Sequence, residues 1–456
     1  MKILMSGEQE QTPKPIRRLN HFRDLASERR EITSHRVPST ASVDASEQAI
    51  GITQERPPVL IMNLFYTGMG IARDLNRTGV RIIGLSAHPN GAGNRTRLCE
   101  VRRSPNSQEQ PELLADFLLE AAAELRGAVI FPTRDFDVLF LDRYRGMLEP
   151  HYRLAIPPRA SLFKVLNKHA LASTARDAGV AVPHSMIVRE PEDLDQAAKE
   201  VGFPSVIKPV SSHQWREGAN WEKVGGRKAF LIDSRETLGR EYAQVSRAHH
   251  ELLVQEWIPG KAEEIVVLGG YVGASSELLA YFTARKIIQS PDEYFGTGCV
   301  VRSEDIPPLF EPTRKLFEAL NYRGMAEVEY KFDARTREFK LIEVNARHWD
   351  QHELGRASGV NLSWTAYTDL TGRPSSFRKE PNLQTTWIAE DAFIRHVLRG
   401  LYRRDIKLRA LYKQVSPPRI YGTFSWRDPW PFAYSLCTQM IPALGKSFLR
   451  NLKKRP

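Results

Sequence analysis

The sequence contains 456 residues, of which 41% are hydrophobic and 26% are charged. This balance is typical of a globular protein, and the length predicts two to four packed units. The formal net charge of +11 suits an anionic ligand, an acidic membrane surface or nucleic acid. However, the basic residues are spread along the chain and no aromatic-studded RNA motif occurs, so we expect no nucleic-acid partner. Phosphate-bearing small molecules explain the charge as well as any other ligand.

The cysteines and the apolar segments bear on the compartment. Cys99, Cys299 and Cys437 are far apart and odd in number, so they predict neither a disulfide framework nor a metal-ligand spacing. No stretch reaches the roughly 18 apolar residues that span a bilayer, and the N-terminus lacks the apolar core of a signal peptide. These features predict a cytoplasmic protein. The C-terminal tail, basic between residues 446 and 455, either contacts an anionic membrane as a peripheral anchor or packs as a subdomain with a solvated end, which we favour.

The N-terminal third predicts an arm followed by an α/β unit. Residues 1–56 show little apolar periodicity and are expected to form a disordered arm. Residues 57–158 alternate apolar strands with helices, which predicts a Rossmann-like parallel sheet. The expected strands are 59–62, 80–85 and 128–131, and the expected helices are 71–78, 113–125 and 137–148. The turn Gly68-Met69-Gly70 lacks the third small residue of a dinucleotide fingerprint, so we interpret it as a tight strand-to-helix turn.

Residues 159–375 predict an α+β domain, for which the family resemblance given below implies two lobes. The expected helices are 162–178, 191–201 and 312–320, and the expected strands are 180–188, 205–208, 252–258, 264–272, 278–286, 326–332 and 338–344. Residues 376–456 are rich in Trp, Tyr, Arg and Pro and show amphipathic helical stretches. They predict a helical, basic C-terminal extension.

Two acidic residues and an amide occupy the last predicted strand pair. On adjacent antiparallel strands Glu329 and Glu343 can point to one face, and Asn345 shares that face because side chains alternate with a period of two. Two carboxylates and an amide oxygen form an all-oxygen site that suits Mg²⁺. A solvated acidic strand face is the alternative, but it explains poorly why Glu343 and Asn345 lie in an apolar run. Glu327 falls on the same face and could assist.

Basic and polar residues follow this strand closely. The planar guanidinium of Arg347 suits a carboxylate or an acyl-phosphate, and neutralisation of the neighbouring acids is the alternative. His348 and His352 lie four residues apart, but no third ligand at zinc spacing is apparent. We interpret His348, Asp350, His352 and Glu353 as a loop that faces the substrate.

Single lysines mark three earlier positions. Lys208 ends the apolar strand 205–208, where a buried cation is costly unless an anion meets it. Lys168 and Lys286 are similar candidates, although each taken alone is more often a surface lysine. The run 254–260 reads as a strand entering a turn, where backbone groups can bind adenine, or as an ordinary strand with solvated acids after it.

The order of these features resembles the ATP-grasp superfamily. It runs Lys168, Lys208, Gln255–Gly260, Glu264, Lys286, Glu329 and then Glu343–Arg347, which resembles the family's E-x-N-x-R element. The chain is also similar to the ATP-dependent carboxylate–amine ligases that include D-aspartate ligase, notably in the segments 285–298 and 421–429. The resemblance covers residues 57 to about 375 well. The loop 209–227 departs from the family because it is long and holds only three glycines.

The resemblance implies roles for these residues. Those expected to bind ATP are Lys168, Lys208 and Lys286 for the phosphates, Gln255, Glu256, Trp257 and Ile258 for adenine, and Glu264 for the ribose. Those expected to bind one or two Mg²⁺ (or Mn²⁺) ions are Glu329, Glu343 and Asn345. The implied activity joins a small-molecule carboxylate to an amine through an acyl-phosphate, with Lys286 and Arg347 as catalytic residues. The alternatives are a small-molecule kinase on the same scaffold and a non-catalytic ATP-binding scaffold.

Overall fold

The computed structural model describes residues 56–374, 384–404, 407–415 and 418–442. The predicted arm, except for Arg56, and the basic end of the C-terminal tail lie outside these residues. Among the described residues, no helix is both long and apolar enough to cross a bilayer.

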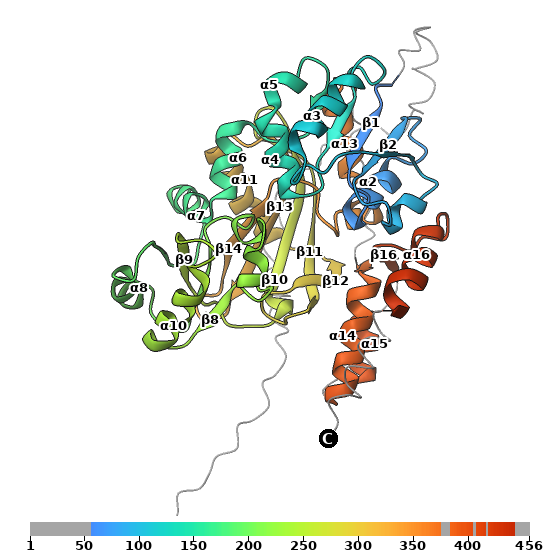
Figure 1. Ribbon diagram of the computed structural model, residues 1–456. Helices are drawn as coiled ribbons and strands as arrows, with labels where there is room; N and C mark the ends of the chain where they lie inside the picture. The colour runs from blue at the N-terminus through green and yellow to red at the C-terminus, as the bar shows by residue number, and fades with distance from the viewer. Residues whose placement is uncertain (1–55, 375–383, 405–406, 416–417, 443–456) are drawn as a thin grey trace, which may run out of the picture. The chain divides into compact units, whose positions relative to one another are not determined.

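The first unit is a five-stranded parallel sheet in the order β3-β2-β1-β4-β5 (Figure 1). Its strands are β1 (Val59–Met62), β2 (Ile82–Ser86), β3 (Glu100–Arg103), β4 (Val129–Phe131) and β5 (Arg153–Leu154). Its helices are α2 (Tyr66–Leu75), η2 (Ala92–Arg95), α3 (Pro111–Glu120), α4 (Asp135–Arg143) and α5 (Arg145–Leu148). The predicted parallel α/β class is confirmed. The strands β3 and β5 were not predicted, because one reads Glu-Val-Arg-Arg on a partly exposed edge and the other has two residues.

The turn from β1 into α2 requires a glycine. A Cβ atom at Gly68 would lie 1.9 Å from the backbone oxygen of Asn63, which itself has a positive φ of 73°. The first turn of α2 therefore lies directly against the end of β1.

The second unit is a four-stranded antiparallel sheet in the order β6-β9-β7-β8. Its strands are β6 (Ser185–Val188), β7 (Ser205–Pro209), β8 (Phe230–Ile232) and β9 (Leu252–Glu256), and α8 (Asp193–Val201) and α10 (Arg235–Val245) pack on it. The loop after β7 contains η3 (Gln214–Arg216) and α9 (Asn220–Lys223). The single predicted helix 162–178 is wrong: α6 (Arg159–Leu166) and α7 (Lys168–Asp177) are separated at Asn167, whose side chain accepts hydrogen bonds from the first two free N–H groups of α7.

The third unit is a seven-stranded sheet in the order β14-β13-β10-β11-β12-β15-β16. Its strands are β10 (Ile265–Val272), β11 (Leu278–Ser290), β12 (Thr297–Ser303), β13 (Gly324–Asp333), β14 (Glu338–Asn345), β15 (Thr386–Ile388) and β16 (Arg419–Tyr421). Associated helices are η4 (Ala262–Glu264), η5 (Pro307–Leu309), α11 (Phe310–Leu320), α12 (Glu353–Ala357) and α13 (Leu362–Leu370). The region beyond residue 376, which we predicted as helical, adds two strands to this sheet as well as helices.

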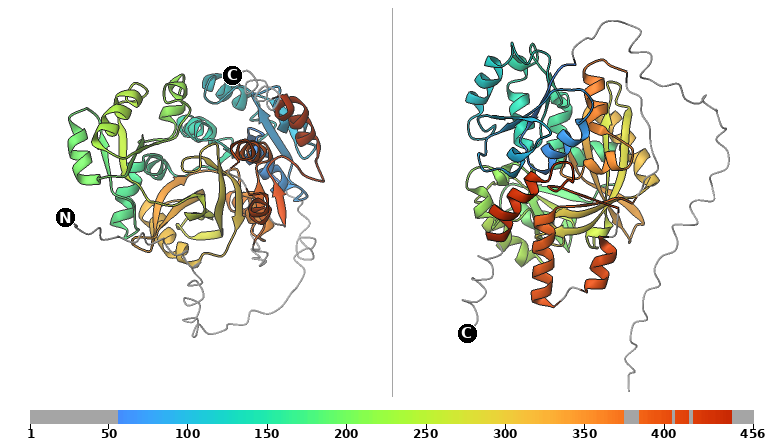
Figure 2. Two further views of the ribbon diagram at one scale, coloured as in Figure 1. Left: turned by 90° about the horizontal axis from the view of Figure 1, so that it is seen from below. Right: turned by 90° about the vertical axis from the view of Figure 1, so that its right-hand side faces the viewer.

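The C-terminal helices are α14 (Glu390–Arg403), α15 (Leu408–Gln414), α16 (Trp430–Ser435) and η6 (Leu436–Met440). Helix α16 lies beside the N-terminal unit (Figure 2). There the guanidinium groups of Arg95 and Arg97 cover the rings of Tyr434 and Trp430. The apolar cores are shared in the same way: the two faces of β1 pack into clusters that also contain residues of β10. This shared packing joins the first unit to the seven-stranded sheet.

Candidate active site

The strands β13 and β14 bring the predicted acidic residues together. Glu329 pairs with Glu343 and Glu327 pairs with Asn345 in the antiparallel register, so all four side chains point to one face, as predicted. The Asn345 amide donates a hydrogen bond to Oε2 of Glu327 at 3.0 Å. A compact patch of three carboxylates therefore lies on this face.

Lysines from three other elements meet this patch. The Lys286 Nζ atom, from β11, lies 2.7 Å from Oε2 of Glu329. The Lys168 Nζ atom, at the start of α7, lies 3.2 Å from Oε1 of Glu343. Ser212 joins them, because its hydroxyl accepts from Lys168 at 2.6 Å and donates to Glu343 at 2.9 Å. We did not predict Ser212 as a site residue from the sequence. The available signal was its position four residues after Lys208, which we did predict.

Lys208 reaches the same region from β7. Its Nζ atom donates to the side-chain oxygen of Gln255 at 2.7 Å, and only 8% of the residue is exposed. Burial, reinforced by the charge of Lys168, lowers the Lys208 pKa to about 7, against the opposing effect of Glu343 and Glu329. A cation that is buried without a carboxylate partner is a receptor for an anion.

Burial and neighbouring charges also shift the pKa values of the carboxylates. Burial and then the neighbouring Glu329 raise the pKa of Glu327 to about 8, although Lys286 and Arg347 oppose the shift. Burial also disfavours the charge on Glu343, but Lys168 and Lys208 outweigh it and hold the pKa of Glu343 below its usual range. The site thus contains buried or half-buried charges of both signs that lie close together.

Strand β9 ends at Glu256, within the run that we predicted as a strand entering a turn, and residues 255–258 are called the hinge below. The Trp257 ring lies under the Lys331 Nζ atom, 4.2 Å from the ring centroid, and that amine donates to the carbonyl oxygen of Gly260 at 2.9 Å. Ile258 is buried. Glu264 ends the short helix η4 and is half-buried.

Glu256 points away from Lys208 and toward the turn between β13 and β14. Its carboxylate binds Arg335 at 2.6 Å and Lys340 at 3.2 Å and accepts from the backbone N–H of His184. Only the backbone of Glu256 is therefore directed along the hinge. The two neighbouring side chains, Gln255 and Glu256, alternate between the faces of β9 as expected for a strand.

Arg347 makes a contact that the sequence did not predict. Its Nε atom lies 2.7 Å from Oδ1 of Asp135, at the start of α4, and its Nη1 atom donates to the carbonyl oxygen of His348. The ion pair joins the first unit to the end of β14. Arg347 therefore neutralises an acid of another unit, and its charge also acts on Glu327.

The prediction that residues 348–353 face a substrate is wrong for the two histidines and Glu353, which are buried. His352 lies 3.4 Å from Asp74 of α2, and His348 lies 3.1 Å from the Ser363 hydroxyl. The apolar side of α2 leaves room for them at Gly70, where a Cβ would meet the His352 ring at 2.7 Å. His352 therefore links α2 to the segment that follows the seven-stranded sheet.

The oxygen donors on this strand face suit Mg²⁺ only if a bound ligand supplies further oxygen donors. Within the described ranges, no group of three or more His, Cys, Asp or Glu residues is arranged to hold a metal ion by itself. Glu329, Glu343 and Asn345 supply oxygen donors on one face of β13 and β14. Mg²⁺ commonly takes one or two carboxylates and completes its shell with phosphate oxygens and water. The residues fit an ion that arrives with phosphates.

No protein-family model matches the sequence. The chain is 24% identical over 279 residues to D-aspartate ligase of Enterococcus faecium, an alignment that covers 58% of this chain and 64% of the relative. It is 28% identical over 171 residues to D-alanine–D-alanine ligase of Ectopseudomonas mendocina, covering 37% of this chain and 50% of that ligase. The chain thus spans between half and two thirds of the length of these relatives.

Solved structures share the fold. The biotin carboxylase of Campylobacter jejuni superposes with a TM-score of 0.57 at 17% identity, covering 72% of this chain and 74% of that one. An ADP complex of N5-carboxyaminoimidazole ribonucleotide synthetase gives a TM-score of 0.57 at 17% identity, covering 76% and 86%. The chain therefore shares the fold of these two enzymes, and in sequence it is similar to the D-aspartate and D-alanine–D-alanine ligases.

Proposed function

We propose that this protein is an ATP- and Mg²⁺-dependent ligase that joins a carboxylate to an amine. The observation that carries the proposal is the pairing of Lys168 with Glu343 and of Lys286 with Glu329, in the same region as Lys208, which is buried without a carboxylate partner among the described residues. Nothing in a purely structural role requires three buried or half-buried lysines at one point. A triphosphate that carries a divalent ion would satisfy both sets of charges at once.

In this proposal the nucleotide lies between the four-stranded and the seven-stranded sheets. Its phosphates replace the carboxylates as partners of Lys168 and Lys286 and supply an anionic partner for Lys208. Adenine lies at the hinge 255–258, where backbone groups and the Trp257 ring are available, and the ribose meets Glu264. Glu329, Glu343 and Asn345 hold Mg²⁺ or Mn²⁺, which supplies charge neutralisation for the transferred phosphoryl group.

The reaction then has two steps. A substrate carboxylate oxygen attacks the γ-phosphorus, the bond from that phosphorus to the β–γ bridging oxygen breaks, and ADP leaves with the electron pair. Lys286 stabilises the charge that develops on the γ-phosphoryl oxygens. The amine nitrogen attacks the acyl carbon, phosphate leaves with the electrons of its C–O bond, and the nitrogen loses a proton to form the amide. Arg347, fixed by Asp135, binds the acyl-phosphate.

The relatives guide the choice of substrates. The names of the D-aspartate and D-alanine–D-alanine ligases indicate amino acids as the substrates of those enzymes. We propose that at least one substrate here is an amino acid, and that the enzyme acts in the cytoplasm.

The test is ADP release from ATP and Mg²⁺ in the presence of a panel of D- and L-amino acids, singly and in pairs. The proposal predicts release that requires both a carboxylate and an amine and that yields an amide in equal amount. ADP release with a stable phosphorylated product and no amine requirement would instead identify a small-molecule kinase. No ADP release with any pair, from a protein that binds ATP, would leave a non-catalytic scaffold.

A further inference from the structure

Helices α14 and α15 form a helical pair that lies between β15 and β16 in the chain. In Figures 1 and 2 both helices extend beyond the end of the seven-stranded sheet. None of the residues proposed for nucleotide or metal binding belongs to the pair. Its exposed side chains are therefore available for a role apart from the proposed chemistry.

One side of the helical pair is fixed to the folded core. The Nη1 atom of Arg399, on α14, donates to the carbonyl oxygen of Pro291 at 2.6 Å. The Nη2 atom of Arg302, on β12, donates to the carbonyl oxygen of Gln414, on α15, at 2.6 Å. Leu411 of α15 is buried in a core cluster that also contains residues of the seven-stranded sheet. The two helices therefore have a buried side and, opposite it, a side that faces outward.

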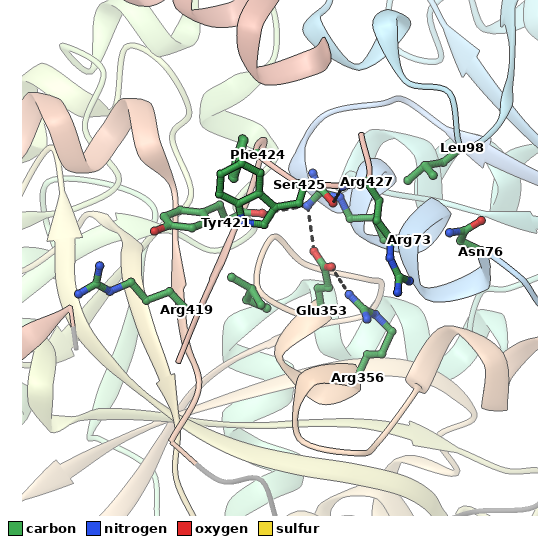
Figure 3. A pocket seen from close by; sticks show the side chains of 12 residues that line it. Arg73, Asn76, Leu98, Glu353, Arg356, Arg419, Tyr421, Phe424, Ser425 and Arg427 are labelled. Atoms are coloured by element: carbon green, nitrogen blue, oxygen red, sulfur yellow. Dashed lines mark hydrogen bonds and ion pairs between the residues drawn. The ribbon is translucent and has the colours of Figure 1, made fainter. Parts of the chain in front are cut away.

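The segments that join the pair to the sheet are fixed to each other. Glu390, the first residue of α14, accepts a hydrogen bond from the backbone N–H of Thr423 at 3.1 Å. Arg73 of α2 donates to the carbonyl oxygens of Tyr421 at 2.8 Å and Thr423 at 2.7 Å. Arg73 is also 3.1 Å from Glu353, which lies beside this segment in Figure 3. The helical pair is thus held at its base, and its outward side is presented in a defined position.

The outward side of the pair exposes apolar side chains. Leu398, Leu401 and Tyr402 lie on one face of α14, because Leu398 is three and four residues from the other two. Leu398 and Leu401 are both exposed, and Tyr402 is 68% exposed. On α15, Tyr412 is 67% exposed. Exposed apolar residues that gather on one surface mark an interaction site.

The same helices carry concentrated positive charge. Five exposed basic residues occur within eleven positions, where Asp405 is the one acidic residue of the sequence: Arg403, Arg404, Lys407, Arg409 and Lys413. None of these five forms an ion pair with a described carboxylate, whereas Arg395, nearer the start of α14, lies 2.6 Å from Asp391. Basic residues combined with exposed leucine and tyrosine are typical of helices that lie in a membrane interface.

The charge of this surface favours an anionic lipid membrane over a second copy of the chain. In a two-fold dimer the same patch of both subunits meets, so the five unpaired basic residues would face their own copies and repel one another. An anionic membrane supplies phosphates for the basic side chains. It also supplies an apolar boundary for the leucine and tyrosine side chains, which a purely polyanionic partner lacks.

We propose that the exposed surface of the helical pair binds an anionic lipid membrane as a peripheral contact. Leu398, Leu401 and Tyr402 enter the boundary between headgroups and acyl chains, and the basic residues from 403 to 413 bind lipid phosphates. The contact is independent of the proposed ligase activity. It is also distinct from the basic residues 446–455, which lie outside the described residues.

The test is sedimentation of the full chain with vesicles of equal parts phosphatidylserine and phosphatidylcholine, and with vesicles of phosphatidylcholine alone. We expect binding to the anionic vesicles that is stronger than binding to the neutral ones and that weakens as salt is added. Each basic residue near an anionic surface contributes about fivefold to partitioning, so Arg403→Gln/Lys407→Gln/Arg409→Gln should lower the partition coefficient about a hundredfold. Leu401→Gln/Tyr402→Gln should lower it at least about tenfold.

The matched control removes the same charge elsewhere. Lys164→Gln/Lys199→Gln/Lys315→Gln changes exposed lysines of α6, α8 and α11 and should alter partitioning less than about threefold. The urea midpoint of every variant should stay close to wild type, because all the substituted side chains are exposed.

Four outcomes would overturn the proposal. The first is no sedimentation with anionic vesicles. The second is unchanged binding in Arg403→Gln/Lys407→Gln/Arg409→Gln, or a loss equal to that of the control, which would assign binding to another part of the chain or to net charge alone. The third is unchanged binding in Leu401→Gln/Tyr402→Gln, which would exclude insertion of the apolar side chains. The fourth is a dimer in sedimentation velocity without lipid that Leu401→Gln/Tyr402→Gln dissociates, which would show that a second copy covers this surface.

Discussion

The pKa of Lys208 provides a prediction that can be worked through quantitatively. In the free protein, burial and Lys168 lower this pKa to about 7, so at pH 8 only about one tenth of the amine is protonated. ATP phosphates beside the amine would favour its charged form and raise the pKa. Binding at pH 8 should therefore take up close to 0.9 proton at this site.

The sign of the pH dependence follows from the same shift. Because the bound form has the higher pKa, ATP affinity is greatest below pH 7 and falls as the pH rises above 7. The fall is at most about tenfold per pH unit, and it ends at the pKa of the bound form.

The assay is calorimetric titration of Mg-ATP at pH 8 in buffers of different ionisation enthalpy. Lys208→Gln keeps a partner for Gln255 but cannot titrate, so the difference in proton uptake between wild type and variant isolates this group. Lys199→Gln, an exposed lysine on α8, controls for the loss of one charge. Equal proton uptake in wild type and Lys208→Gln would refute the reasoning.

Three further predictions concern single residues. Glu343→Gln should lower ADP release at least about a hundredfold while the urea midpoint stays close to wild type, and undiminished turnover would reject its metal role. Arg73→Met should lower the free energy of unfolding by about 3–5 kcal/mol, because it leaves the buried Glu353 without one partner; a loss below about 1 kcal/mol in urea titration would contradict this. Gly68→Ala should cost about 1–3 kcal/mol in the same assay, because its Cβ meets a backbone oxygen, whereas Gly146→Ala, with nothing within 4 Å, should not destabilise.

The central part of the candidate site could be predicted because its signals are local. The period-two alternation of strands and the short connection between β13 and β14 are enough to place Glu329 opposite Glu343. The positions of Lys168, Lys208 and Lys286 were predicted only through their order along the chain, since a single lysine gives no local signal.

The remaining features depend on contacts between distant residues. Strands β15 and β16 have three residues each and exist because β12 offers an edge for pairing. Arg347 meets Asp135, 212 residues earlier in the chain, and His352 meets Asp74, so neither burial nor partner could be read from the segment itself. The helix break at Asn167 could have been predicted, because asparagine is a favoured N-cap. We predicted one continuous helix because the apolar pattern continues across this residue.

A crystal structure with a non-hydrolysable ATP analogue and Mg²⁺ tests the central claim most directly. We predict that the phosphates contact the amines of Lys168, Lys208 and Lys286 and that the metal ion contacts the carboxylates of Glu329 and Glu343. A nucleotide bound elsewhere, with Lys168 still paired to Glu343 and Lys286 to Glu329, would contradict it.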